Sequence, residues 1–317
     1  MSAQVQVLPD GRLHLHHGPI DLICQAWGED TAVRAGCARA VERFHTVLPE
    51  LVEELPALRS DHAALTGQIA RKMAEAVAPF RPAFITPMAA VAGVVAEEIL
   101  ARIVGPGVSR AYVNNGGDIA LHLSPGTHLV CAMAQGGVVR VEATTPVRGI
   151  ATSGWRGRSW SLGIADAVTV LARTAAMADA AATMIANAVD VPGHQAVERR
   201  PARLMQAESD LGERLVTVNV GPLRPEEAGR ALDAGLAAAQ AFAARGLIEG
   251  AALFLQGQVR IHGQMSLQKE TEGARLPNPP HHASDRGNSP RFRPRASHAA
   301  CAWSGDGGGE KPVCGPL

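Results

Sequence analysis

The hydrophobic pattern of this 317-residue chain ends at about Gly263, which limits the part of it that can form a packed core. Residues 264–317 contain seven Pro and seven Gly, but Ile, Leu, Val and Phe together supply only five. Such a segment cannot bury enough apolar surface to offset the entropy cost of ordering it. The sequence therefore predicts a single folded domain over residues 1–263 and a Pro/Gly-rich disordered tail over residues 264–317.

The charge and the aromatic content exclude several classes of protein. Thirty Lys and Arg balance thirty Asp and Glu, whereas a dedicated nucleic-acid binder normally carries a basic excess. Aromatic residues make up only 3% of the chain, so few rings can stack on bases. Pro87, Glu97 and Glu98 interrupt the longest apolar stretch, so no membrane span is expected. Because the N-terminus also lacks a signal pattern, we expect a cytoplasmic protein without nucleic-acid or membrane partners.

Short strands and helices are interleaved along the first 263 residues. Alternating or continuous apolar runs between turn signals predict strands at Val5–Leu8, Arg12–His16, Ile20–Ala26, Arg110–Val113, Asp118–Leu123, Leu129–Ala134, Val138–Ala143, Gly149–Thr152, Val168–Leu171, Leu215–Val220 and, as a closing hairpin, Ala251–His262. Helical spacing predicts helices over residues 30–59, 61–78, 86–104, 175–189 and 225–245. The strands come in hairpin-like clusters and do not alternate strictly with helices, which favours an α+β fold with antiparallel sheets.

Asn114, Gly116, Gly117 and Asp118 form the first motif that could carry chemistry. A predicted strand runs into two adjacent glycines and leaves through an aspartate into the next strand. Glycines accept positive φ and let a ligand approach the backbone closely. The alternative is a tight hairpin turn, because Asn-Gly and Gly-Gly are common hairpin residues.

Thr152, Ser153 and Gly154 end another predicted strand, and Arg156 and Arg158 follow closely. Hydroxyl groups, exposed backbone N–H groups and guanidinium groups suit a phosphate oxygen. An ordinary strand-ending loop with solvated arginines is the alternative interpretation.

Asp179 and Thr183 lie four residues apart on a predicted alanine-rich helix and therefore share one face. One carboxylate and one hydroxyl match a partial Mg²⁺ site that backbone carbonyls, waters and substrate phosphates would complete. The alternative is a solvated or capping aspartate on a helix that needs alanine for close packing.

Taken together and in this order, the three segments resemble the ApbE superfamily, the flavin transferases that move FMN from FAD to a protein. The similar pieces are N-N-G-G-D at 114–118, G-I-A-T-S-G at 149–154 and V-T-V-L-A-R-T-A-A-M-A-D-A-A-A-T at 168–183. The run S-L-G-I-A-D-A-V-T-V-L-A resembles an uncharacterised branch of short cytoplasmic ApbE-like proteins. The resemblance implies an ApbE-like (T-fold-like) fold, with antiparallel sheets packed against helices in a single domain.

The resemblance also implies roles for individual residues. Asp179 and Thr183 would hold Mg²⁺ against the pyrophosphate of FAD, which makes Asp179 the candidate catalytic residue. The cofactor-binding candidates are Asn114, Gly116, Gly117, Asp118, Thr152, Ser153 and Gly154. FAD would be a substrate or a ligand, and a flavin transferase would also need an acceptor protein as its partner.

The sequence departs from the transferases in one segment that bears on activity. They follow the T-S-G loop with a His-x-x-Asp-Pro-x-Thr-Gly type element, and here residues 156–166 contain no His and no Asp-Pro. Three hypotheses follow: a Mg²⁺-dependent enzyme that transfers FMN or cleaves the pyrophosphate, a non-catalytic module that binds a flavin or another phosphorylated metabolite, or an enzyme acting on a different small molecule. The apolar segment 86–104 is either core or the contact of a homodimer, and core is the preferred interpretation.

Overall fold

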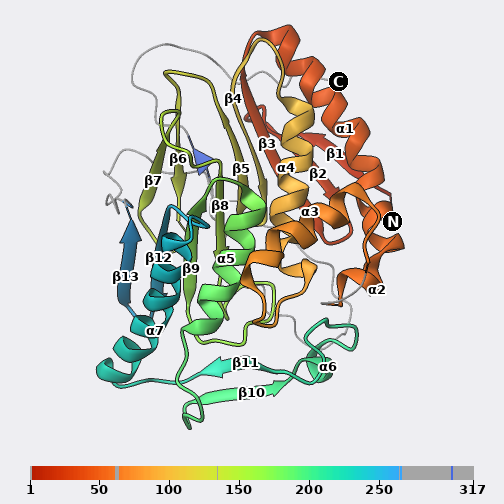
Figure 1. The fold of residues 1–317 in the computed structure, drawn as a ribbon. Helices are drawn as coiled ribbons and strands as arrows, with labels where there is room; N and C mark the ends of the chain where they lie inside the picture. Colours follow the sequence, from red (N-terminus) through yellow and green to blue (C-terminus); the bar gives the residue numbers. More distant parts are fainter. Residues whose placement is uncertain (1, 61–63, 134, 264, 266–300, 303–317) are drawn as a thin grey trace.

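A nine-stranded antiparallel sheet forms the centre of the protein (Figure 1). The computed structural model describes residues 2–60, 64–133, 135–263, 265 and 301–302. The strand order is β1-β2-β3-β4-β5-β8-β9-β12-β13, and every neighbouring pair is antiparallel. The strands of this sheet are β1 (Gln4–Val7), β2 (Leu13–His17), β3 (Ile20–Gly28), β4 (Val108–Asn115), β5 (Asp118–Leu123), β8 (Gly149–Ser153), β9 (Ala167–Ala172), β12 (Gly250–Leu255) and β13 (Gln258–Gly263).

All the helical segments except α6 contribute to the larger of two hydrophobic cores, which lies on one face of this sheet (Figure 1). The apolar stretch around residues 91–103 lies inside this core, so the preferred interpretation of that stretch agrees with the structure. Within the described residues, no helix is both long and apolar enough to span a membrane. The helical segments are α1 (Asp30–Glu53), α2 (Leu55–Leu58), α3 (Gln68–Val77), η1 (Ala78–Phe80), η2 (Pro87–Ala90), α4 (Val91–Ile103), α5 (Ala175–Ala188), α6 (Ala202–Met205) and α7 (Pro225–Ala244).

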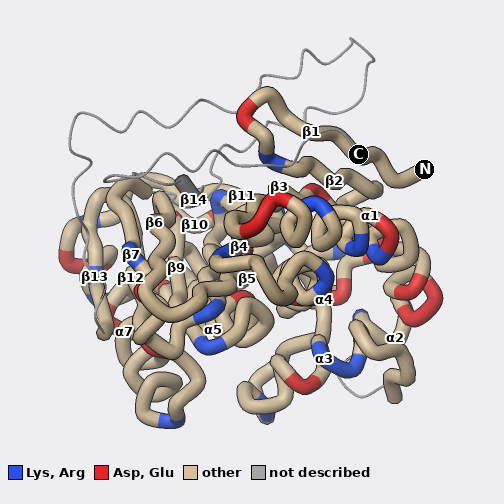
Figure 2. Tube along the Cα trace, turned by 90° about the horizontal axis from the view of Figure 1, so that it is seen from above, with Lys and Arg blue, Asp and Glu red and all other residues tan. Residues whose placement is uncertain are grey.

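The opposite face of the sheet carries a second, smaller core. The hairpin of β6 (His128–Ala132) and β7 (Val138–Glu142) contributes Leu129 and Val141 to it. Figure 2, the view turned by 90°, separates this side of the molecule from the side with α3 and α5. Because successive strand residues point to opposite faces, Ala120 lies in the helix-side core and its neighbour Ile119 in the other. This alternation decides which polar side chains of β4, β5 and β8 can face the helices.

The predicted α+β single-domain fold is confirmed, and each predicted strand corresponds to a strand of the structure. A strand that the sequence analysis missed, β10 (Val197–Pro201), pairs with β11 (Leu215–Val220) across the lower end of α5 (Figure 1). Most of the predicted tail, residues 264–317, lies outside the described residues. The exceptions are Met265 and β14 (Cys301–Ala302), which pairs with β6. The domain boundary and the disorder of the tail remain predictions.

The predicted helix over residues 86–104 is interrupted at Ala90. The 3-10 segment η2 begins at Pro87, as the Thr-Pro signal predicts, but α4 starts afresh at Val91 because Ala90 leaves the helical conformation (φ −125°, ψ 10°). A second helix N-terminus is thereby created in the middle of the expected helix, with backbone N–H groups that need acceptors.

Glu98 joins three helices on the side of α4 that faces α1 and α3. Its carboxylate is 3% exposed and accepts hydrogen bonds from Arg43 (2.8 Å), Lys72 (3.1 Å) and Arg102 (3.2 Å). Burial alone would raise the pKa of Glu98, but these three cations outweigh it and lower that pKa to about 2. The ionised carboxylate therefore stabilises the fold at neutral pH.

We expect Glu98→Gln to lower the free energy of unfolding at pH 7 by about 2 kcal/mol, less than for a fully buried pair because Lys72 and Arg102 are partly exposed. The folded-state pKa lies below the ordinary value, so the wild-type advantage is present above pH 4.5 and shrinks as the pH falls toward 2. Urea unfolding of both proteins at pH 7 and pH 3 measures this. A difference of the same size at both pH values would contradict it.

Candidate functional site

The helices α4 and α5 begin in close contact with each other. A Cβ placed on Gly93 would lie 2.3 Å from the carbonyl oxygen of Ala175, so only glycine permits this approach. The strand β8 is equally close to the start of α5, because a Cβ on Gly149 would lie 2.2 Å from the carbonyl carbon of Thr174. The alanines of α5 supply the small surface that such packing needs. Two helix N-termini, with their partial positive charge, therefore meet at one place beside the sheet.

Each of these two helices supplies a carboxylate to the N-terminus of the other. Asp179 on α5 accepts a hydrogen bond from the backbone N–H of Gly93 at 3.0 Å, and Glu97 on α4 accepts one from Ala176 at 2.9 Å. Burial raises the pKa of Glu97 in spite of these N–H donors. Asp179 therefore caps a helix, as the alternative interpretation states. The helix that it caps is α4, whereas Asp179 itself belongs to α5.

Asp118 and Asp179 are two partly buried carboxylates whose charges interact. By strand alternation Asp118 shares the face of Ala120 and points toward the helices. Burial raises the pKa of Asp118 to about 7, although the N–H of Thr152 (3.2 Å) and the charge of Arg158 oppose the shift. Burial and then repulsion by Asp118 raise the pKa of Asp179 well above its usual range. Since neither carboxylate has an ion-pair partner among the described residues, the pair has the electrostatics of a cation site.

The glycine turn lies next to this carboxylate pair. Gly116 and Gly117 have φ values of 65° and 115°, which favour glycine. Asn114 stabilises the turn, because its Oδ1 accepts a hydrogen bond from the N–H of Gly117 at 2.8 Å. Asn115, which the sequence analysis did not select, donates from Nδ2 to the carbonyl of Ala92 at 3.2 Å and so ties the turn to the start of α4. The motif is a tight hairpin turn, as the alternative interpretation states, and it leads directly into Asp118; its role in binding a ligand remains a prediction.

The Thr152–Gly154 segment contributes its backbone to the site and not the Thr152 hydroxyl. Thr152 donates its N–H to Asp118, while its hydroxyl bonds to the hydroxyl of Thr169 at 2.9 Å on the opposite face of the sheet. By the same alternation Ser153 lies on the side of the helices. A Cβ on Gly154 would come within 2.7 Å of the carbonyl oxygen of Asp166, so the loop that follows packs tightly here.

Asp166 is occupied in fixing that loop. Its carboxylate accepts hydrogen bonds from Arg156 (2.7 Å), the Trp155 indole (3.2 Å) and the N–H of Gln256 (2.6 Å). A carboxylate with three donors has little capacity left for a ligand. Asp166 lies in the segment that replaces the transferases' His and Asp-Pro element. Its carboxylate therefore has a structural role.

The donor set of the site limits which metal could bind there. Within the part of the chain that the structure describes, no three His, Cys, Asp or Glu residues converge as a metal-binding group. The partly buried Thr183 follows Asp179 by one helical turn, so the helix offers one carboxylate and one hydroxyl. Mg²⁺ is commonly held by one or two carboxylates, with waters and phosphate oxygens as the remaining ligands. The partly buried pair Asp118 and Asp179 fits that pattern and lacks the histidines or thiolates that zinc prefers.

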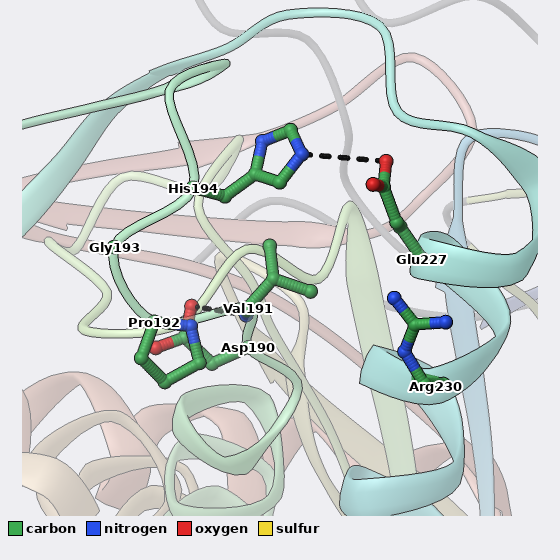
Figure 3. Close-up of a pocket in the computed structure, with 7 residues that line it drawn as sticks. All are labelled: Asp190, Val191, Pro192, Gly193, His194, Glu227 and Arg230. Atoms are coloured by element: carbon green, nitrogen blue, oxygen red, sulfur yellow. Dashed lines mark hydrogen bonds and ion pairs between the residues drawn. The ribbon is translucent and has the colours of Figure 1, made fainter.

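A pocket of about 450 Å³ lies elsewhere, beyond the C-terminal end of α5 (Figure 3). His194 and Glu227 face each other across it, with 3.3 Å between Nε2 and Oε2. Its two acids already have partners, since Glu227 binds Arg224 and Asp190 binds Arg199. None of the predicted site residues lines this pocket. Its lining residues are Asp190, Val191, Pro192, Gly193, His194, Glu227 and Arg230.

Comparison with known proteins finds UPF0280 proteins among the relatives of this chain. A "UPF0280 protein" of Archaeoglobus fulgidus is 34% identical over 152 residues, which are 48% of this chain and 64% of that protein. Another of Methanosphaerula palustris is 36% identical over 172 residues, 52% of this chain and 70% of that protein. The chain thus spans less than two thirds of the Archaeoglobus relative.

Among solved structures, the apo form of the flavinyl transferase ApbE of Pseudomonas stutzeri is 14% identical and covers 82% of this chain and 94% of its own, with a TM-score of 0.39. A TM-score that low supports no argument about the site.

The family described as "AbpE bacteria" matches residues 5–261, which include the glycine turn, the Thr152–Gly154 segment and the Asp179 helix. This chain is therefore a member of the AbpE bacteria family.

Proposed function

We propose that this protein binds FAD, or a related phosphorylated nucleotide, together with Mg²⁺ at the site between α4, α5 and the glycine turn. The observation that carries the proposal is the pair of partly buried carboxylates Asp118 and Asp179, neither of which forms an ion pair within the described residues. Two like charges in a poorly solvated place are unfavourable unless they share a proton or bind a cation. Family membership and the three ordered motifs make a phosphate-bound divalent cation the preferred choice.

The chain's own residues have separate tasks in this proposal. Asp179 and Thr183 of α5 would hold the ion, and Asp118 at the start of β5 would supply a second carboxylate. Gly116 and Gly117 leave the backbone open to the nucleotide. The segment Thr152–Gly154 borders the ligand from the end of β8.

The chemistry that the site supports best is attack on the pyrophosphate. Bound Mg²⁺ would neutralise charge on the phosphate oxygens and favour the departure of AMP. An acceptor oxygen forms a bond to the phosphorus of the FMN half, the bond from that phosphorus to the AMP oxygen breaks, and the acceptor proton goes to solvent. With a hydroxyl of an acceptor protein the product is a flavinylated protein, and with water it is free FMN.

One observation favours a second candidate, a module that binds the flavin or another phosphorylated metabolite without transferring it. Asp166 is held by three donors, and residues 156–166 offer no His and no Asp-Pro dipeptide to take part in the reaction. In this candidate the carboxylate pair and the glycine turn keep their binding roles. A different small-molecule reaction on the same scaffold would also retain the carboxylate pair.

We expect the full chain, incubated with FAD and Mg²⁺, to release AMP and FMN, which chromatography detects directly. The matched control is Asp179→Asn, whose amide oxygen can still accept from Gly93 but carries no charge. Release by the wild type alone supports the enzyme. Binding of FAD without release of either product supports the non-catalytic module. If neither protein binds FAD, as measured by calorimetry, the flavin proposal is wrong.

A further inference from the structure

The guanidinium of Arg158 lies directly on the glycine turn. A Cβ on Gly116 would be 1.9 Å from its Nη2 and 2.7 Å from its Cζ, so glycine alone leaves room for it in this position. Arg158 belongs to the loop after Gly154, which the hydrogen bonds to Asp166 fix in place. The side chain thus reaches from an anchored loop across the edge of the acidic site.

The charge of this guanidinium acts on two carboxylates. Its positive charge contributes to lowering the pKa of Asp21, mainly set by the hydrogen bond from His14 at 2.6 Å, and it opposes the burial that raises the pKa of Asp118. Yet within the described ranges Arg158 forms neither a hydrogen bond nor an ion pair. Arg156, two residues earlier, is by contrast bound to Asp166 and stacked on Trp155 at 4.7 Å.

We propose that Arg158 binds the phosphate of the ligand at the outer edge of the Asp118 and Asp179 site, and that it selects for phosphorylated ligands. The inference rests on the proposed function and adds a residue that the family motifs do not supply. A guanidinium presents paired N–H donors that match two phosphate oxygens, and those of Arg158 have no other acceptor. Its place on Gly116 puts a bound phosphate next to the glycine turn that leads into Asp118.

Charge balance links this contact to the cation. Without ligand, the positive guanidinium faces the negative Asp118 and reduces the attraction of the carboxylate pair for a second cation. When a phosphate binds the guanidinium, its negative charge offsets that of Arg158, and the guanidinium no longer weakens cation binding. Arg158 therefore strengthens phosphate binding and, in the absence of phosphate, weakens cation binding.

The test measures two affinities of the full chain and of Arg158→Ala: that for Mn²⁺ alone, and that for FMN at saturating Mn²⁺. We expect the FMN affinity of the variant to fall about tenfold, as for the loss of a charge-assisted hydrogen bond, while its Mn²⁺ affinity stays equal or rises. Arg158→Lys should lie between the two, because it keeps the charge without the planar fork. Arg140→Ala, which removes an exposed arginine of β7, should match the wild type in both affinities.

Several results would overturn the inference, and they can be told apart. Parallel loss of both affinities in Arg158→Ala means that Arg158 has only a structural role. Unchanged FMN affinity in that variant contradicts the Arg158 assignment and leaves the proposed function intact. If wild-type protein binds Mn²⁺ but not FMN or FAD, the proposed function fails together with this inference.

Discussion

Asp179→Asn should reduce Mn²⁺ affinity by about 100-fold or more, while the metal-free protein becomes no less stable and gains up to about 1 kcal/mol in free energy of unfolding. The two effects have one origin. The substitution removes a charge that Asp118 repels, and the Asn oxygen can still accept the hydrogen bond from Gly93. Electron paramagnetic resonance of free Mn²⁺ measures the binding, and urea unfolding with a chelator present measures the stability.

The opposite pair of results would show that Asp179 serves only as a cap of α4 and does not bind the cation. In that case the variant would be less stable than wild type and would retain its Mn²⁺ affinity. Functional sites commonly combine a gain in stability with a loss of activity when a strained or repelled group is removed, whereas a cap loses stability on replacement.

Gly93→Ala should destabilise the fold by about 3 kcal/mol or more, because it must separate two packed helices. Its Cβ would meet three backbone atoms, with the carbonyl oxygen of Ala175 at 2.3 Å and the nitrogen of Ala176 at 2.7 Å. Backbone atoms cannot rotate away as a side chain does. The same displacement would move the N–H of Gly93 from Asp179, so ligand binding should be lost along with stability.

Gly229→Ala is the matched control for that substitution. Gly229 is also a buried helical glycine, in α7, but its nearest neighbours are the ends of Arg260 and Gln258, both at 3.6 Å. An alanine there meets only ordinary contacts and gains helix propensity, so we expect a stability equal to wild type or higher by up to about 1 kcal/mol. Thermal and urea unfolding of wild type and both variants measure these differences in stability. Equal behaviour of the two would contradict the close approach of α4 and α5.

The strands and most helices could be predicted because local periodicity determines them. The break at Ala90 could not, because the acceptor that stabilises the new N-terminus at Gly93 is Asp179, 86 residues farther along the chain. A Thr-Pro start signal marks η2 correctly, yet nothing local indicates that α4 begins at Val91, four residues after Pro87. Tertiary partners of this kind lie outside any local pattern.

The site motifs could be found from sequence, but not the direction in which their side chains point. Asn114 and Thr152 were selected for their side chains, and the pleat turns both away from the helices, while the neighbouring Asn115 faces α4. Glu97 was noted only as an interruption of an apolar stretch, and it caps α5. Strand parity would have distinguished Asn114 from Asn115, because Val113 is a core residue of the helix side.

The central claim is that the carboxylate pair binds a divalent cation together with a phosphorylated flavin nucleotide. Calorimetric titration of FAD into the full chain, once with Mg²⁺ and once with a chelator, tests it most directly. We expect FAD to bind at least about tenfold more tightly with Mg²⁺, because Asp118 and Asp179 would hold an ion that neutralises the phosphates. Equal FAD affinity in the two conditions, or no FAD binding in either, would contradict it.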